Sequence, residues 1–301
     1  MSVLAIVAAL LLEQWRALDQ GKGVEPALAA GATWLERTFN GGERRHGTIA
    51  WLVGVLPLVL VSIVLHELLL SVHFLLAALF HVAVLYFTLG FRQFSHYFTE
   101  LQVAVKSGDI ERARALLEAW RGASGVVRTR EEVIRLAIEA ALISSHRHVF
   151  GVIFWYVLLP GPSGAILYRL SAYLYERWQN LGTFGWLAQR AFELIDWPAV
   201  RATAASFAVV GDFEDSVYCW RTQARTWGDP NEGVILGAGA GAMGVRLGMP
   251  VQEVEGMQPR SELGVGELAD GPFLDSTVGL VWRALVVWIF VLLLVTIARV
   301  F

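Results

Sequence analysis

The sequence predicts an all-α integral membrane protein, built as a helical bundle with a re-entrant hairpin and amphipathic cytoplasmic helices. The first observation is composition: 55% of the 301 residues are hydrophobic and only 17% are charged, whereas soluble domains carry about a quarter charged residues. The second is a series of long apolar runs, and the third is the scarcity of strand-like alternation. We therefore expect one membrane domain over residues 1–301.

The first apolar segment, residues 2–12, is shorter than the roughly 20 residues that a spanning helix needs. No basic residue precedes it, and Glu13-Gln14-Trp15 follows where a signal-peptide cleavage site needs small residues. We expect a buried or interfacial helix, or a span lengthened by its flanks, and not a cleaved signal peptide.

Residues 49–91 are almost continuously apolar, about twice the length of one span. They predict two antiparallel helices, 49–66 and 72–91, with a tight turn near His66 to Val72. The last apolar segment, residues 277–298, predicts a further span in which Arg283 snorkels to the near interface. The turn carries no Lys or Arg while both flanks of the pair do, so the flanks are expected in the cytoplasm.

Residues 149–171 are apolar but are interrupted by Pro160, Gly161, Pro162 and Gly164. A full span would place the Arg-rich region after it outside the cell, against the positive-inside rule. Since Pro-Gly-Pro is strong turn chemistry, a re-entrant hairpin is favoured, with a span as the alternative.

Three regions, 13–48, 92–148 and 172–276, are expected to be cytoplasmic and helical. One helix is predicted to start after Ser107 and Asp109 and to end at Gly122, and another to start at Thr129. Residues 249–271 are rich in Gly, Glu and Pro and are expected to be irregular. Together these segments predict a multi-pass protein of the bacterial inner membrane, with the lipid bilayer as its partner.

Two features exclude other classes of protein. The net charge is −3 and no basic stripe carries interleaved aromatic residues, so nucleic acid is not an expected partner. Cys219 is the single cysteine, which excludes an internal disulfide and a cysteine-based zinc site. No metal site is assigned, and the sequence leaves the oligomeric state open.

Two motifs have both a functional and a packing interpretation. "GAGAMG", residues 239–244, fits a dinucleotide fingerprint, but no clear strand precedes it, so close approach of helices is favoured. His66, His73 and His81 repeat at spacings that place them near one helical face, with His66 expected in the turn. A proton or metal site is the functional interpretation, and polar packing inside the bundle is the favoured one.

Four blocks between residues 107 and 250, about half the chain, resemble the CobD/CbiB family of membrane proteins. The first begins at Gly108-Asp109 with Ala113-Arg114, and the second ends in a Pro-Gly turn and Leu-Tyr-Arg. The third is "FGWLAQRAFELIDWPAVR", and the fourth is "DPNEGVILGAGAGAMGVRLGMPV". The residues matched within the second block are Arg135, Glu139, Phe154, Pro162, Gly164, Leu167, Tyr168 and Arg169.

The resemblance implies adenosylcobinamide-phosphate synthase, which joins cobyric acid to an aminopropanol phosphate through an amide bond with ATP. The family's Glu-Asn-Thr-x-Asp patch is replaced here by residues 143–147, and its N-terminal signature has no counterpart. These departures look like AmpE, a branch associated with β-lactamase induction and cell-wall signalling. We therefore expect a non-catalytic accessory or regulatory protein without cofactors, and the ATP- and magnesium-dependent ligase is the alternative.

The expected ligand site is a cytoplasmic pocket below the hairpin that binds an anion or a membrane-protein partner. Its guanidiniums suit phosphate or carboxylate, while buried ion pairs that only orient the helices are the competing interpretation. No catalytic residue is assigned. The candidate ligand-binding residues are Arg135, Glu139, His146, Arg147, Arg169, Asp196 and Arg201.

Overall fold

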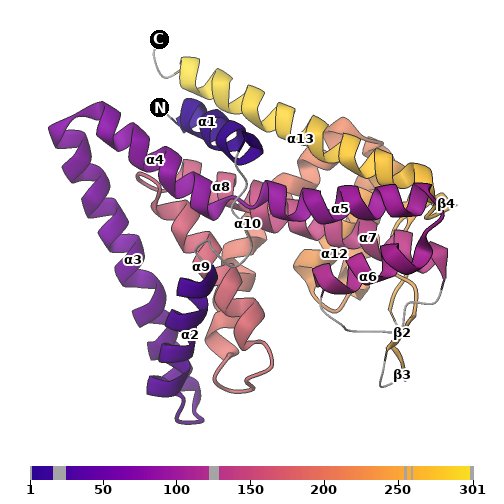
Figure 1. Ribbon diagram of the computed structural model, residues 1–301, viewed down its shortest axis with the longest axis horizontal. Coiled ribbons are helices and arrows are strands. Elements are labelled where there is room, and N and C mark those ends of the chain that lie inside the picture. The colour runs from indigo at the N-terminus through magenta and orange to yellow at the C-terminus, as the bar shows by residue number, and fades with distance from the viewer. Residues whose placement is uncertain (1, 16–24, 122–128, 254–255, 259, 299–301) are drawn as a thin grey trace. The chain divides into compact units, whose positions relative to one another are not determined.

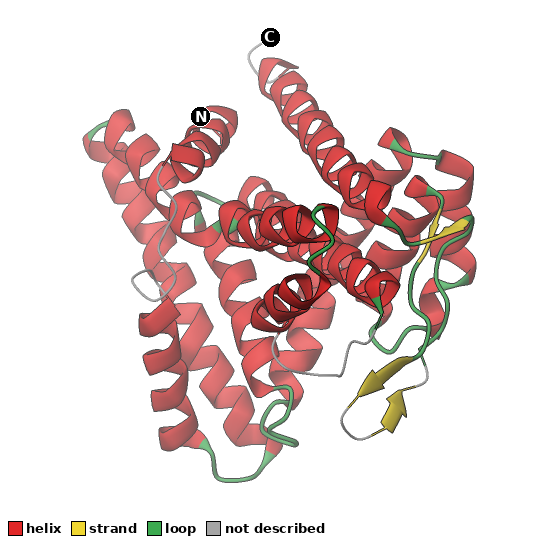
Figure 2. Cartoon of the chain, turned by 45° about the vertical axis from the view of Figure 1, so that its right-hand side comes forward, coloured by secondary structure: helices red, strands yellow, loops and turns green. Residues whose placement is uncertain are grey.

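The computed structural model describes residues 2–15, 25–121, 129–253, 256–258 and 260–298. Helices make up most of these residues (Figure 2), which confirms the predicted all-α class. The chain divides into two compact units: unit 1 contains Met1–Gln93 and Arg147–Ala199, and unit 2 contains Phe94–His146 and Val200–Phe301. That residues 1–301 form one family domain stays a prediction.

Unit 1 holds the N-terminal helices and a later helical hairpin. The division between the units falls within α5 (Phe91–Lys106), within a π-helical turn, η1 (His146–Phe150), and within α10 (Trp186–Val210). The helices that lie wholly in unit 1 are α1 (Ser2–Trp15), α2 (Glu25–Phe39), α3 (Arg44–Val72), α4 (Phe74–Thr88), α8 (Gly151–Leu158) and α9 (Ser163–Trp178).

The described part of unit 2 adds six helical segments and four short strands. β1 (Val245–Arg246) pairs in parallel with β4 (Glu267–Leu268), and β2 (Val251–Glu253) pairs antiparallel with β3 (Gly256–Gln258). Short ladders thus organise a stretch that was expected to be irregular. The helical segments are α6 (Ile110–Arg121), α7 (Arg130–Ser145), α11 (Phe213–Thr222), the 3-10 turn η2 (Ala224–Thr226), α12 (Pro230–Met243) and α13 (Gly271–Ala298).

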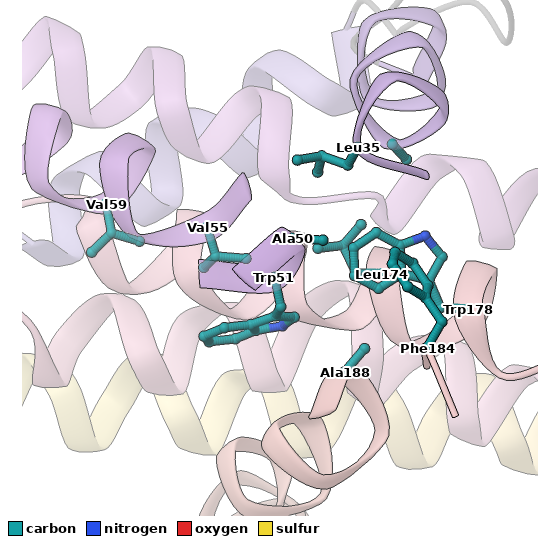
Figure 3. Packing of buried hydrophobic residues seen from close by; sticks show 10 residues of the cluster. Leu35, Ala50, Trp51, Val55, Val59, Leu174, Trp178, Phe184 and Ala188 are labelled. Atoms are coloured by element: carbon teal, nitrogen blue, oxygen red, sulfur yellow. The ribbon is translucent and has the colours of Figure 1, made fainter. Parts of the chain in front are cut away.

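The core of unit 1 lies where α2, α3 and α9 pack side by side (Figure 1). Trp51, Val55 and Val59 follow one another at intervals of four residues, so they share one face of α3. Figure 3 shows this face against Leu174 and Trp178 of α9. Burying each large side chain contributes about 1.5–3 kcal/mol, which fixes α3 against the hairpin.

Two helices, α3 and α13, are long and apolar enough to cross a membrane, each with a mean hydropathy of 2.6. Only 28% and 22% of their most apolar windows are buried, whereas the core helix of a soluble protein is mostly buried. The first apolar segment forms α1, a shorter apolar helix that packs on α4.

The break between α3 and α4 lies at His73, later than the sequence predicts. Residues 66–72 contain no Gly or Pro, so nothing ends the helix before Val72. His73 takes an extended conformation, and its Nδ1 accepts the backbone N–H of Leu75 at 3.2 Å. This side-chain cap begins α4, and the expectation that His66 lies in the turn is wrong.

Residues 146–178 form a helical hairpin in which η1 and α8 lead into a turn and α9 returns. Gly161 has φ +62°, and the Ser163 hydroxyl donates to the Pro160 carbonyl at 2.7 Å. The turn therefore lies at the predicted Pro-Gly-Pro site. That the hairpin re-enters a membrane stays a prediction.

Two predicted helix starts are confirmed by their caps. Asp109 Oδ1 accepts the backbone N–H of Arg112 at 3.1 Å at the start of α6. Thr129 and Glu132 form a reciprocal capping box at the start of α7, an arrangement that typically contributes about 1 kcal/mol.

Glycines in and just before "GAGAMG" allow α12 to lie directly against α11. A Cβ at Gly241 would lie 2.4 Å from the Asp215 carbonyl oxygen, and one at Gly237 would lie 3.3 Å from that of Cys219. Helix α11 and the turn η2 precede α12, where a dinucleotide site needs a strand. The close-approach interpretation is therefore confirmed, and the nucleotide alternative is wrong for this segment.

Glu36 joins α2 to α9 through both carboxylate oxygens. Arg177 Nε donates to Oε1 at 2.6 Å and Nη2 to Oε2 at 3.2 Å, and Trp178 Nε1 donates to Oε1 at 2.9 Å. Burial raises the pKa of Glu36, but the hydrogen bonds from Arg177 and Trp178 outweigh it and hold the pKa below its ordinary value of 4.5.

We expect Glu36→Gln to lower the free energy of unfolding by about 1–3 kcal/mol, because hydrogen bonds to a charged acceptor become weaker neutral ones. The pKa of Glu36 is lower in the folded state, so its contribution is complete above pH 4.5 and is lost as the pH falls through the folded-state pKa. Unfolding in detergent measured at a series of pH values should show this loss in the parent and not in the variant. An identical acid dependence in both proteins would contradict the assignment.

Candidate anion-binding site

Glu139 of α7 is the centre of a buried polar cluster in unit 2. It is 2% exposed, and both its carboxylate oxygens accept hydrogen bonds. The backbone N–H of Gly248 donates to Oε1 at 3.0 Å, and Arg260 Nη2 donates to Oε2 at 2.9 Å. Glu139 thus ties α7 to the loop after β1 and to Arg260.

Arg135 lies one helical turn before Glu139 and is 4% exposed. Its Nε is buried and has no hydrogen-bond partner among the described residues. Burial lowers the pKa of Arg135, the charge of Glu139 opposes this, and Arg260 lowers it further. Two guanidiniums therefore lie in the field of Glu139, while Glu132 and Glu131 act more weakly on Arg135.

Trp227 forms one side of the cluster. The Arg260 guanidinium lies over the Trp227 ring, 4.4 Å from the ring centroid. The indole Nε1 of Trp227 donates to Glu232 Oε2 at 3.4 Å. Glu232 follows Asp229, whose side chain accepts the N–H groups of Asn231 and Glu232 and begins α12. The fourth sequence block thereby supplies the start of a helix next to Arg260.

A second polar group lies in unit 1 at the base of the hairpin. The Tyr168 hydroxyl donates to buried Asp196 at 2.7 Å, and Arg169 Nη1 lies 2.9 Å from His148 Nδ1. Burial, followed by the charges of Arg169 and Arg147, lowers the pKa of His148 well below its ordinary value of 6.5. The neutral imidazole can therefore accept the hydrogen bond from Arg169.

Arg147 reaches the surface of unit 1 and pairs with an acid. Its Nη1 donates to Glu176 Oε1 at 3.2 Å, and its guanidinium lies 5.6 Å from the ring centroid of Tyr175. The side chain is 14% exposed and that of Glu176 is 53% exposed. The expected role of Arg147 in anion binding stays a prediction.

The predicted site residues fall into both units. Arg147, Arg169 and Asp196 belong to unit 1, while Arg135, Glu139, His146 and Arg201 belong to unit 2. Within unit 2, His146 is buried and its Nδ1 lies 2.9 Å from Thr203 Oγ1, and Arg201 is half-buried on α10. The structure brings Arg135 and Glu139 together, and one pocket shared by all seven residues stays a prediction.

Arg260, Trp227 and Gly248 were not among the residues predicted from the sequence. Arg260 lies in the Gly-, Glu- and Pro-rich stretch, where no periodicity assigns a direction to any side chain. Trp227 precedes "GDPNEG", the start of α12. This position just before a helix cap was the only local signal that could have marked Trp227 as a site residue.

Two of the three apolar-region histidines meet inside unit 1. His81 Nε2 lies 3.0 Å from His66 Nδ1, and His81 Nδ1 lies 2.6 Å from the Tyr156 hydroxyl. His73 instead caps α4 and stacks on Phe74. No group of three or more His, Cys, Asp or Glu side chains that could hold a metal ion occurs in the described part of the chain.

The chain matches the family model "CobD/Cbib protein" over residues 6–271. A cobalamin biosynthesis protein CobD of Stutzerimonas stutzeri is 34% identical over 300 residues, which cover 96% of both chains. The protein of that name from Chromobacterium violaceum is 34% identical over 71% of this chain and 70% of its own. The one from Mycobacterium tuberculosis is 29% identical over 52% of this chain and 53% of its own. No solved structure matches the chain.

These relatives overturn the expectation of an AmpE-like regulator without catalysis. That expectation depended on polar residues of the family that are missing from a few short motifs of this chain, and on a similar order of segments in AmpE. The relatives carry the name of a biosynthetic protein, and the first of them aligns along almost the entire chain, including the N-terminal half. The chain belongs to the CobD/Cbib protein family.

Proposed function

We propose that this chain is an amide ligase of cobalamin biosynthesis, an adenosylcobinamide-phosphate synthase. The observation that carries the proposal is the 34% identity to a cobalamin biosynthesis protein CobD over 96% of both chains. The family model supports it because it extends across both units.

The reaction joins a carboxylate of cobyric acid to the primary amine of an aminopropanol phosphate. A C–N bond forms, and the carboxylate loses one oxygen to a phosphoryl group of ATP, while the amine releases protons. All three substrates are anionic or carry a phosphate. A protein that binds them needs fixed cations at the places where their oxygens lie.

The cluster of Arg135, Glu139 and Arg260 supplies such cations. Two guanidiniums next to one carboxylate leave a net positive charge, and the low exposure of Arg135 strengthens its field because little water screens it. The polar group of unit 1 adds Arg147 and Arg169. These residues would bind and orient substrate oxyanions.

ATP and magnesium belong to the chemistry that this family implies. Magnesium in such sites is usually held by one or two carboxylates together with substrate phosphates and water. The described residues bring together no group of three or more acids or other ligands for a metal ion. The proposal therefore concerns the chain's own residues and assigns no metal ligands.

The proposed location is the bacterial inner membrane, with the lipid bilayer as partner. Helices α3 and α13 have the length and hydropathy of spans, and their faces expose side chains such as Val64, Leu68, Val286 and Phe290. The hairpin of α8 and α9 is proposed to enter the bilayer and return, which keeps the Arg-rich regions in the cytoplasm.

Complementation tests the function. In a bacterial strain that lacks its own amide ligase of the corrin pathway, expression of this chain should restore growth without added corrinoid. Membranes that contain the chain should convert cobyric acid, aminopropanol phosphate and ATP into an amide product of the expected mass. An expressed, membrane-localised chain that fails in both assays would overturn the proposal, and a vector without insert is the control.

A further inference from the structure

We propose that the cluster of Arg135, Glu139 and Arg260 is a binding site for the phosphate group of a phosphate monoester, with Arg135 as the cation that the ligand neutralises. The assignment of that monoester as the aminopropanol phosphate rests on the proposed function. The site itself is argued from charge, burial and hydrogen bonding within unit 2.

The charges of the cluster do not balance without a ligand. Glu139 uses one oxygen for the Gly248 N–H and the other for Arg260. The charge of Glu139 acts on Arg135, but the Nε of Arg135 has no hydrogen-bond partner among the described residues. Glu132 and Glu131 also act on Arg135, but more weakly than Glu139, and they lie outside the buried cluster in the first turn of α7, where Glu132 caps the helix. Within the cluster itself, two guanidiniums therefore face one carboxylate, and the deeply buried one, Arg135, is the one whose Nε has no partner among the described residues.

A buried cation of this kind is costly for a purely structural element. Removing a guanidinium from water without a full set of partners lowers stability by several kcal/mol, and an apolar side chain of similar size is often the more stable choice. Arg135 is nevertheless 4% exposed. A negatively charged ligand next to Arg135 would offset this cost, which accounts for a buried arginine at this position.

The surrounding groups suit a phosphate. Arg260 is held in position by Glu139 on one side and by the Trp227 ring on the other, and its side chain is 19% exposed. Its remaining N–H groups and those of Arg135 offer planar, charged donors of the kind that bind phosphate oxygens. The more exposed Arg260 marks the side from which a small anion can enter.

The phosphate ester is the substrate group that fits a fixed cation best. The carboxylate and the phosphoryl group of ATP are both consumed as the amide forms, whereas the ester phosphate is unchanged from substrate to product. Binding this unreacting group lets the enzyme hold the amine in place. A phosphate dianion also neutralises the positive charge of the cluster more fully than a carboxylate does.

The test is ligand binding by calorimetry with the full chain in detergent. Aminopropanol phosphate should bind at least tenfold more tightly than aminopropanol. Arg135→Leu should reduce its affinity at least tenfold without lowering the thermal unfolding midpoint. Arg135→Lys should restore part of the affinity. Arg130→Leu is the matched control, because Arg130 lies on the same helix, is 55% exposed and is 3.7 Å from Asp270.

Two outcomes would overturn the site. One is unchanged affinity in Arg135→Leu; the other is a lowered unfolding midpoint in that variant with affinity intact, which would make Arg135 structural. Dependence on Arg135 for ATP and not for aminopropanol phosphate would overturn the assigned ligand. If complementation fails while phosphate binding requires Arg135, the proposed function falls and the phosphate site stands.

Discussion

Replacing Glu139 with Gln should lower the free energy of unfolding by about 3–5 kcal/mol, because the change leaves buried Arg135 and partly buried Arg260 without their shared carboxylate. The Gly248 N–H keeps an amide oxygen as acceptor, but the amide nitrogen then faces Arg260 at a place where the carboxylate accepted at 2.9 Å. The variant should also lose the proposed ligase activity, since Arg260 is no longer held over Trp227.

The same loss should be partly reversed by a second change. In Glu139→Gln, the repulsion between Arg135 and Arg260 is uncompensated, and Arg135→Leu removes it. The double variant should therefore be at least about 1 kcal/mol more stable than the sum of the single effects predicts. Thermal and denaturant unfolding of the four proteins measures this coupling, and additive effects would show that the two arginines do not share Glu139.

Local sequence chemistry predicted the elements whose signals are short and directional. Thr129 and Glu132 indicated the start of α7, and Pro160 to Pro162 indicated the turn of the hairpin, because these residues act on backbone groups within four positions. The break between α3 and α4 was misplaced because it depends on a His73 side-chain cap inside a run without Gly or Pro.

The candidate site was predicted only where helical spacing alone brings residues together. Arg135 and Glu139 are four residues apart on one helix, so their proximity follows from the sequence. Arg260 reaches the same carboxylate from 121 positions further along the chain, through a stretch whose short strands no pattern revealed. Long-range pairing of this kind needs the tertiary structure. The AmpE-like branch was wrongly predicted because it depended on a few short motifs, whereas the similarity to the relative from Stutzerimonas stutzeri extends along 96% of the chain.

The second large effect is expected at Gly164, where α9 crosses α8 with almost no space between the backbones. A Cβ at this position would lie 1.8 Å from the carbonyl oxygen of Trp155. Trp155 is also held through its side chain, because its Nε1 donates to the Ile195 carbonyl at 2.9 Å. Gly164→Ala should therefore separate the two arms of the hairpin and cost at least about 3 kcal/mol, at the upper end of overpacking effects.

The matched control is Gly31→Ala in α2 of the same unit, where a Cβ would meet nothing within 4 Å. Alanine is favoured over glycine inside an exposed helix by about 1 kcal/mol, so the same substitution should raise stability there. The opposite signs separate a packing effect from any general effect of alanine, and unfolding in detergent measures both. Because the hairpin turn also lies against His66, with a Cβ at Gly161 only 2.7 Å from its ring, opening the hairpin should disturb the contact with α3. Equal stability of the two variants would mean that the arms of the hairpin do not pack as closely as Gly164 indicates.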